Sequence, residues 1–292
     1  MNNIISEQNN AGNIQLLKAQ RVAYTISKNC SIVEYVIVAI SMIIPIVLIF
    51  KPSLNQQSSV VIFSGLLMII SILLDGFMKN RTSVAAKIQE QFDNNLFHLN
   101  WNKLLCENMV ENEDIIRLAK RYKKNDLNNW YSTEIKSDLN QEIAVLLCQK
   151  TNVFWDKDLR KKYKVILYTI LAIYYLLIVS IGYMKNIPFE SFTLIFLPSL
   201  TFLKYQIQLI SNQNQIIKKK ESIITKINEL LNTFKTTNNL PDYSDLREIQ
   251  NAIYSLRTHL NKVPNWLYRL YKNSYEYLTD NSIRMKINEL TN

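Results

Sequence analysis

The chain has 292 residues, of which 48% are hydrophobic, and its formal net charge is +10. This length would allow two soluble domains, but the apolar residues are concentrated in long runs, which favours a membrane protein. Only four glycines are present, and none belongs to a glycine-rich phosphate-binding motif, so dinucleotide-binding and P-loop folds are excluded. The three cysteines lie far apart, so neither a disulfide framework nor a paired-cysteine zinc site is expected.

The first segment, residues 1–30, is polar and amphipathic. It has no short apolar core followed by a small-residue cleavage site, so we expect no cleaved signal peptide. Ile14, Leu17 and Tyr24 lie near one face of a helix, with Lys18 among the interspersed cations. This spacing predicts an N-terminal helix that leads into the first membrane span.

Four uncharged apolar runs are suited to a hydrocarbon core of roughly 30 Å. They are Ile32–Phe50 (with Glu34 at its entrance), Val60–Leu74, Val165–Met184 and Phe192–Leu203. A soluble core helix is the alternative for the short fourth run, but each short run follows a full-length one across a brief polar link. We therefore predict an all-α membrane protein with four transmembrane helices in two hairpins, residues 31–78 and 163–204. Pro45 and Pro198 are expected to kink the first and fourth helices.

The orientation follows from the positive-inside rule. The two short links contain only Lys51 and Lys185 of the chain's 34 lysines and arginines. We therefore expect a multi-pass protein of the inner (plasma) membrane whose two termini and central segment all face the cytoplasm. Attraction to anionic lipid head groups explains the net positive charge as well as binding to a nucleic acid would.

The central segment, residues 79–162, predicts a helical cytoplasmic module. Ile88, Phe92, Leu96 and Leu99 recur at three- and four-residue steps, and no strand-like alternation is present. Acidic residues at 111, 113 and 114 are typical of a solvated helix N-terminus, where negative charge is favourable.

The C-terminal segment, residues 205–292, predicts further cytoplasmic helices. Ile210, Ile217, Ile224 and Leu231 occupy one heptad position, which favours a fourth span that continues into a long helix. This apolar face could pack against the central module or join copies of the chain. The long helix is expected to end near residues 238–241, before helices near 243–261 and 265–289.

Several motifs carry a resemblance to a known family. They are Ile5-Ser-Glu-Gln-Asn9, Ala19-Gln-Arg21, Ile88-Gln-Glu-Gln-Phe-Asp93, Leu99-Asn-Trp-Asn102, Asn129-Trp-Tyr131, Cys148-Gln-Lys-Thr-Asn152, Trp155-Asp156 and Leu159-Arg160. In this order they resemble the SMODS-associating four-transmembrane effector family along essentially the whole chain. The resemblance implies a bacterial antiphage effector of the CBASS type, encoded beside an enzyme that makes cyclic oligonucleotides. Such an effector would bind the nucleotide through its cytoplasmic part, then oligomerise or rearrange and breach the membrane, so that the cell dies before phage release.

A cyclic oligonucleotide requires cations for its phosphates, aromatic planes for its bases and hydrogen-bonding groups for the base edges. Candidates for stacking are Trp101, Trp130, Tyr131 and Trp155; candidates for phosphate contacts are Lys150 and Arg160; candidates for base edges are Gln91, Asp93, Asn102, Gln149 and Asn152. The alternative is structural: the tryptophans would be core or membrane-interface anchors, and Gln91 and Asp93 would join helices to one another.

We find no nucleophile–base pair, metal-ligand spacing or paired catalytic carboxylates, so we expect neither an enzyme nor a cofactor. The expected partners are a cyclic oligonucleotide second messenger, membrane lipid and other copies of the chain, with no nucleic-acid polymer. The competing hypothesis is a constitutive membrane scaffold or small channel that recruits partners through its cytoplasmic helices.

Overall fold

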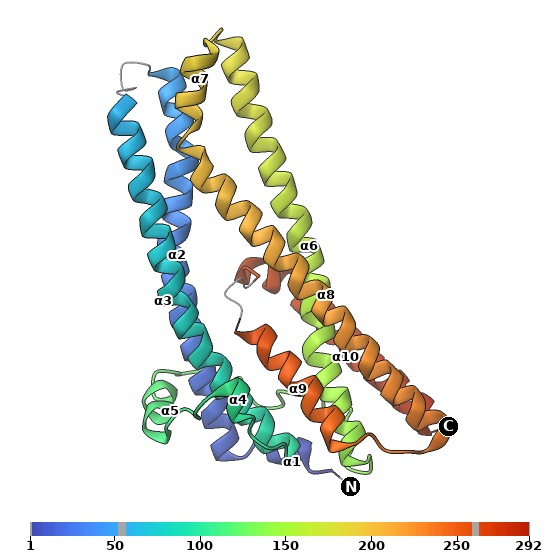
Figure 1. Cartoon of the computed structure of the whole chain (residues 1–292). Coiled ribbons are helices and arrows are strands. Elements are labelled where there is room, and N and C mark those ends of the chain that lie inside the picture. The colour runs from blue at the N-terminus through green and yellow to red at the C-terminus, as the bar shows by residue number, and fades with distance from the viewer. Residues whose placement is uncertain (1, 52–56, 259–262, 292) are drawn as a thin grey trace. The chain divides into compact units, whose positions relative to one another are not determined.

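Helices form almost all of the regular structure. This computed structural model describes residues 2–51, 57–258 and 263–291, and no strand occurs in these ranges. The helices are α1 (Ile4–Glu7), α2 (Ala11–Phe50), α3 (Gln57–Phe97), α4 (Lys103–Cys106), α5 (Asn112–Ala119), α6 (Gln141–Met184), α7 (Phe189–Phe196), α8 (Ser199–Thr237), α9 (Tyr243–Arg257) and α10 (Asn265–Thr291) (Figure 1). The predicted all-α class is confirmed.

The chain divides into two compact units. The core unit contains Met1–Ile26, Asn80–Lys161 and Gln215–Asn292, and the membrane unit contains Ser27–Lys79 and Lys162–Asn214. The long helices α2, α3, α6 and α8 each contribute residues to both units. Each unit is therefore built from segments that are distant in the sequence.

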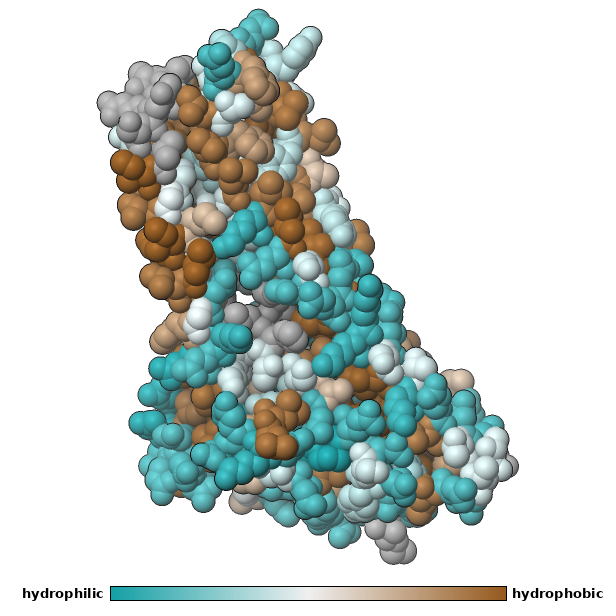
Figure 2. Space-filling view, in the orientation of Figure 1, coloured by the Kyte–Doolittle hydropathy of each residue, from teal (hydrophilic) through white to brown (hydrophobic). Residues whose placement is uncertain are grey.

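The membrane unit presents apolar side chains on its outside. Among the described residues, Ala11–Phe50, Ile62–Phe97 and Gln141–Met184 are long and apolar enough to cross a membrane. The pair α7 and α8 passes the same test as one bent span, which would make a fourth. Leu73 and Leu176 expose 69% and 68% of their surface, and brown atoms dominate the corresponding surface in Figure 2. Such exposure is favourable only where the surroundings are lipid.

The fourth predicted span is broken rather than continuous. Its helix stops at Phe196 and resumes at Ser199, and the two parts meet at 56°. Pro198 stands at the break and has no N–H for a helical hydrogen bond, so the predicted kink is confirmed. Nearby, α6 and α7 come very close, because a Cβ added to Gly182 would lie 2.7 Å from the Phe192 ring.

Inside the membrane unit, α2, α6 and α8 share a small apolar cluster. Val38, Tyr174, Ile178 and Phe202 are its buried members. The Tyr174 hydroxyl donates to the carbonyl of Met42 at 3.0 Å, which satisfies a phenol that would otherwise be costly in an apolar setting.

The core unit has one large apolar core to which all of its long helices contribute. Its buried residues include Ile88, Phe92 and Leu96 of α3, Ile143 and Leu146 of α6, Ile216, Ile223, Ile227 and Leu231 of α8, and Leu246 and Ile253 of α9. The heptad face of α8 thus packs against residues of the central segment, as one of the two sequence-based interpretations predicted. Leu17 of α2 is fully buried in the same core, which agrees with the predicted N-terminal helix.

The middle of the central segment is less helical than predicted. Between the end of α3 and the start of α6 only the short α4 and α5 occur, and residues 120–140 contain no helix. This stretch is rich in Asn, Asp and Ser, whose side chains compete for backbone hydrogen bonds. Leu127, Tyr131 and Ile135 fix it to the core, each with at most 4% of its surface exposed. The predicted acidic N-terminus is present at the start of α5.

The C-terminal helices end and begin close to where the sequence predicts. Helix α8 ends at Thr237, and Asn238 adopts a φ of 57°, the left-handed conformation that commonly terminates a helix. Helices α9 and α10 follow, and they bring their apolar faces to the same core.

Candidate functional site

Two carboxylates on α3 lie completely inside the core unit. Glu90 and Asp93 are three residues apart, so they share one face of the helix, and neither is exposed to solvent. Buried carboxylates are very unfavourable unless charged or hydrogen-bonding partners compensate them. Their partners therefore define the most polar part of this core.

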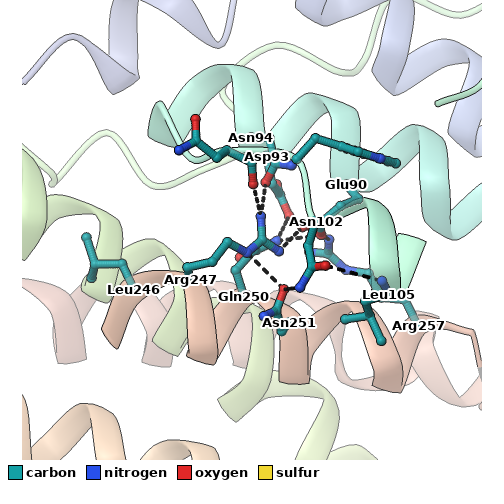
Figure 3. Close-up of polar contacts among 12 residues, drawn as sticks. Glu90, Asp93, Asn94, Asn102, Leu105, Leu246, Arg247, Gln250, Asn251 and Arg257 are labelled. Carbon is teal, nitrogen blue, oxygen red and sulfur yellow. Dashed lines mark hydrogen bonds and ion pairs between the residues drawn. The ribbon is translucent and has the colours of Figure 1, made fainter. Parts of the chain in front are cut away.

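Helix α9 supplies those partners from one of its faces. Arg247 Nη2 lies 2.5 Å from Glu90 Oε1, and Arg257 Nη1 lies 2.6 Å from Asp93 Oδ2. Between them, Gln250 Nε2 donates to Glu90 Oε2 at 2.8 Å and to Asp93 Oδ2 at 3.0 Å. Figure 3 shows the α9 side chains pointing toward the two acids. Two guanidinium groups thus balance the two carboxylates.

The loop before α6 adds an aromatic hydroxyl to this group. Tyr131 donates to Asp93 Oδ1 at 2.7 Å and accepts from Asn152 Nδ2 at 2.8 Å. Its ring stacks on Phe92, with centroids 6.3 Å apart and planes 11° apart. Burial, with the nearby charge of Asp93, raises the pKa of Tyr131 well above its usual value. The phenol therefore remains a neutral donor.

A glutamine of α6 connects to the same group. Gln149 is fully buried, and its amide nitrogen donates to Gln250 Oε1 at 3.2 Å and to the carbonyl of Leu246 at 2.9 Å. Together these side chains form what we call the α3–α9 polar cluster: Glu90, Asp93, Tyr131, Gln149, Asn152, Arg247, Gln250 and Arg257. Four segments distant in sequence meet there.

Burial and neighbouring charges have opposite effects on the pKa values of Glu90 and Arg257 in the cluster. Burial raises the pKa of Glu90, and the guanidinium groups of Arg257 and Arg247 oppose that effect. Burial alone would lower the pKa of Arg257, but the negative charge of Asp93 raises it instead. The cluster is thus held by mutual compensation, and loss of one member leaves an uncompensated buried charge.

Some polar atoms in and beside the cluster remain unsatisfied. Within the described part of the chain, Arg257 Nη2, Gln149 Oε1 and Asn94 Nδ2 are buried and have no hydrogen-bond partner. Buried polar atoms nearly always find a partner. Arg257 Nη2 and Asn94 Nδ2 could donate a hydrogen bond to water or a ligand, and Gln149 Oε1 could accept one.

A second ionic group, in which the two cations are buried and the carboxylate is partly exposed, lies between α6 and α8 of the core unit. Asp156 Oδ2 lies 2.5 Å from Arg160 Nε and 3.1 Å from Lys220 Nζ. Burial acts to raise the pKa of Asp156, but the two cations outweigh it and hold that pKa below its usual value. Arg160, a predicted phosphate ligand, therefore has a carboxylate partner here.

Four of the eleven predicted ligand residues converge on the α3–α9 polar cluster: Asp93, Tyr131, Gln149 and Asn152. Asn102 is next to it, because its amide donates to Asn251 of α9 at 3.2 Å while its oxygen caps α4. Trp130 packs edge-on against Phe92, and the Arg21 guanidinium lies 5.4 Å from its ring centroid.

The other predicted residues have separate surroundings. Gln91 donates to the carbonyl of Val110 at 3.1 Å, and the Trp101 indole donates to the carbonyl of Glu107 at 2.8 Å. Trp155 meets Tyr268 and Tyr275 edge-on, with centroids 4.7 Å and 5.9 Å away. These contacts agree with the structural interpretation of the tryptophans.

Lys150 lines a small hollow at the surface of the core unit, next to Lys286 of α10. Burial and the charge of Lys286 lower the pKa of Lys150. The hollow has a volume of about 20 Å³, which is space for one water molecule rather than a nucleotide.

Sequence reasoning missed half of the cluster: Glu90, Arg247, Gln250 and Arg257. A signal for Glu90 was present, because Ala86, Glu90, Asp93 and Phe97 lie along one helix face and all are fully buried. Charges on an otherwise apolar face require internal partners. The α9 residues gave no comparable local signal, because Arg247 and Gln250 lie 157 and 160 residues from Glu90 in the chain.

The fold defines an α-helical membrane protein whose core unit contains a buried polar cluster. Within the described residues no group of three or more potential metal ligands occurs. The model of the SMODS-associating 4TM effector domain matches residues 2–286, and the chain belongs to this family.

One curated relative supports the same conclusion. A protein of Bacillus cereus (strain VD146), named as a probable CBASS effector molecule, is 29% identical over 280 residues, which are 91% of this chain and 92% of the relative. No solved structure matches the chain. The chain is therefore a membrane effector of the antiphage defence class, as the sequence motifs implied.

Proposed function

We propose that this protein is a cyclic-oligonucleotide receptor that permeabilises the bacterial inner membrane and thereby stops phage propagation. The observation that carries the proposal is the convergence of Asp93, Tyr131, Gln149 and Asn152, chosen for nucleotide chemistry, on one buried cluster with two arginines. The family membership supplies the defence context. The core unit, with both termini, would face the cytoplasm, where the nucleotide is made.

The cluster offers the chemistry that a cyclic oligonucleotide needs. Guanidinium groups bind phosphate in a bidentate manner as readily as they bind carboxylate. A phosphate could therefore replace Glu90 or Asp93 as the partner of Arg247 or Arg257, and Arg257 Nη2 already has a free N–H direction. The stacked Phe92 and Tyr131 rings and nearby amides could then hold a base.

Because the cluster is buried, a nucleotide could reach it only after α9 separates from α3. This requirement provides the difference in affinity between two states that any ligand-driven switch needs. Helix α3 continues from Asn80 of the core unit into Lys79 of the membrane unit. A change at Glu90 could thus act on a membrane helix through the continuous backbone.

Dye leakage from liposomes tests the proposal directly. The full chain is reconstituted into dye-filled liposomes at a fixed protein-to-lipid ratio. Leakage is then followed after addition of individual cyclic di- and trinucleotides. We expect leakage with one of these nucleotides and none with linear dinucleotides. Leakage without nucleotide would favour the constitutive-channel alternative, and absence of leakage with the whole panel would contradict the proposal.

A matched pair of arginine variants locates the receptor site. Arg257→Gln removes a cluster guanidinium, whereas Arg284→Gln removes one that pairs with Glu134 on the surface, at 2.7 Å. The first variant should lose nucleotide-dependent leakage and nucleotide binding by calorimetry, and the second should keep both. Circular dichroism and size-exclusion chromatography check that each variant is folded. Equal behaviour of two folded variants would exclude the cluster as the receptor site.

A further inference from the structure

The membrane unit contains a hollow beside the broken fourth span. It has a volume of about 350 Å³, and Ser64, Gly65 and Met68 of α3 face Leu200, Thr201 and Lys204 of α8 across it. This size lies at the lower end of the range of small-molecule sites in proteins. The hollow is far larger than the single-water hollow of the core unit, so it could hold a substantial part of a ligand.

Local features of α3 and α8 account for the hollow. Leu197 and Leu200 flank Pro198 and both line it, so the hollow begins at the break between α7 and α8. On the opposite wall Gly65 has no side chain, and a Cβ placed there would meet nothing within 4 Å. The missing side chain and the interrupted helix therefore leave space in the same place.

The lining of the hollow is mostly apolar, and Lys204 is its one charged residue. From Leu200 to Lys204 helix geometry gives a length of about 6 Å. Met68 and Leu200 supply apolar walls, and the Ser64 hydroxyl is already used, since it donates to the carbonyl of Val60 at 2.7 Å. Lys204 is the last residue of α8 in the lining, so its side chain supplies a positive charge there. This arrangement matches an amphiphile that has an acyl chain and an anionic head.

Lys204 can interact with an anionic head although an acid is nearby. Glu34 of α2 interacts electrostatically with Lys204 and is hydrogen-bonded to Asp75 of α3. An ammonium has three N–H donors, which allows it to contact a carboxylate and a phosphate at once.

We propose that this hollow binds an anionic phospholipid of the surrounding bilayer, with acyl-chain atoms between α3 and α8 and the phosphate at Lys204. An unfilled apolar hollow in a membrane loses dispersion contacts along its walls, and a lipid tail is the apolar molecule always at hand. The bound lipid stabilises the conformation that has the α7–α8 break, because a ligand favours the state to which it binds.

Native mass spectrometry of the full chain released from nanodiscs tests the site. One set of nanodiscs contains phosphatidylglycerol and the other phosphatidylcholine. We expect the protein to retain phosphatidylglycerol in preference. Lys204→Gln should reduce that preference by about fivefold, since one lysine near an anionic surface contributes about this factor. An unchanged preference in Lys204→Gln would overturn the role assigned to the ammonium.

Two glycine variants on α3 test the position of the acyl chain. Gly65→Phe places a ring in the hollow and should abolish lipid retention. Gly76→Phe is the matched control, because a Cβ there also meets nothing within 4 Å but Gly76 does not line the hollow. Equal retention by both variants would overturn the proposal. A change in subunit number for Gly65→Phe with lipid retention unchanged would also overturn it, because the hollow would then be an interface between copies.

Discussion

The Tyr131 hydroxyl donates a hydrogen bond of 2.7 Å to Asp93, and this contact joins the loop before α6 to helix α3 inside the core unit. The same hydroxyl accepts from Asn152, so one phenol satisfies groups on two helices. The backbone of Tyr131 is also held, because its N–H donates to Gln8 Oε1 at 2.8 Å. Hydrogen bonds to Gln8, Asp93 and Asn152 thereby tie a segment without helix to the rest of the core unit.

Tyr131→Phe should destabilise the core unit by about 1–3 kcal/mol, because Asp93 Oδ1 and the Asn152 amide each lose the hydrogen bond that the hydroxyl makes. Chemical denaturation in a mild detergent, followed by tryptophan fluorescence, measures the loss. Tyr122→Phe is the control: that hydroxyl contacts Asp126 at the surface, and its removal should change the free energy of unfolding by less than about 0.5 kcal/mol. Equal effects of the two substitutions would contradict the buried role of Tyr131.

The pair of Asp93 and Arg257 should show strong energetic coupling. Asp93→Asn alone leaves the Arg257 guanidinium buried without its principal counter-charge, which costs about 3–5 kcal/mol. The double variant Asp93→Asn, Arg257→Gln removes both charges, so its loss should be smaller than the sum of the single losses. A double-mutant cycle measures the difference. Additive losses would mean that the two charges do not stabilise one another.

The membrane-spanning helices were predictable because lipid imposes a simple rule on sequence. A helix exposed to hydrocarbon must be apolar around its whole circumference, so Ile32–Phe50 and Val165–Met184 are evident without any knowledge of tertiary contacts. The break at Pro198 was also predictable, since the missing N–H is a local property. The heptad of α8 placed Leu231 on an apolar face with two possible uses, packing in the core or joining copies, and the structure buries Leu231 in the core.

The α3–α9 polar cluster was only partly predictable because its members are distant from one another in sequence. Asp93 belongs to a motif that the family resemblance identifies, but Arg247 and Arg257 lie on a helix that has no such motif. Nothing near either arginine indicates that it is buried, and long cationic side chains on helices are usually exposed. The contact between α3 and α9 depends on the whole core and therefore appears only in the structure.

Acid should weaken the ionic group around Asp156. Its pKa is lowered in the folded protein, so its contribution to stability is complete above the usual carboxyl pKa and is lost as pH falls through the lower folded value. The wild type should therefore lose stability below about pH 4, and Asp156→Asn should have a flatter profile there. Thermal unfolding midpoints of the wild type and of Asp156→Asn, measured in buffers of decreasing pH, test this difference. Since 31% of the side chain is exposed, solvent screening keeps the effect modest.

Cys106 offers a reporter for separation of α9 from α3. Its thiol is fully buried against Ala86 of α3 and Tyr254 of α9. Burial, together with the negative charge of Glu90, raises the pKa of the thiol to about 12, so almost no thiolate exists at neutral pH. Cys106 should therefore be inert to maleimide in the resting protein.

If a cyclic oligonucleotide reaches the α3–α9 polar cluster, Cys106 should become reactive, because the departure of Tyr254 would expose the thiol to water and lower its pKa. The experiment uses a Cys30→Ser, Cys148→Ser background and follows maleimide incorporation by mass spectrometry with and without nucleotide. The control is the converse variant, which keeps Cys148 and carries Cys30→Ser and Cys106→Ser. Cys148 lies on α6 and is fully buried in the large apolar core. It should therefore react with maleimide more slowly than Cys106 when nucleotide is present. Nucleotide that binds without increasing Cys106 labelling would place the receptor site elsewhere in the core unit.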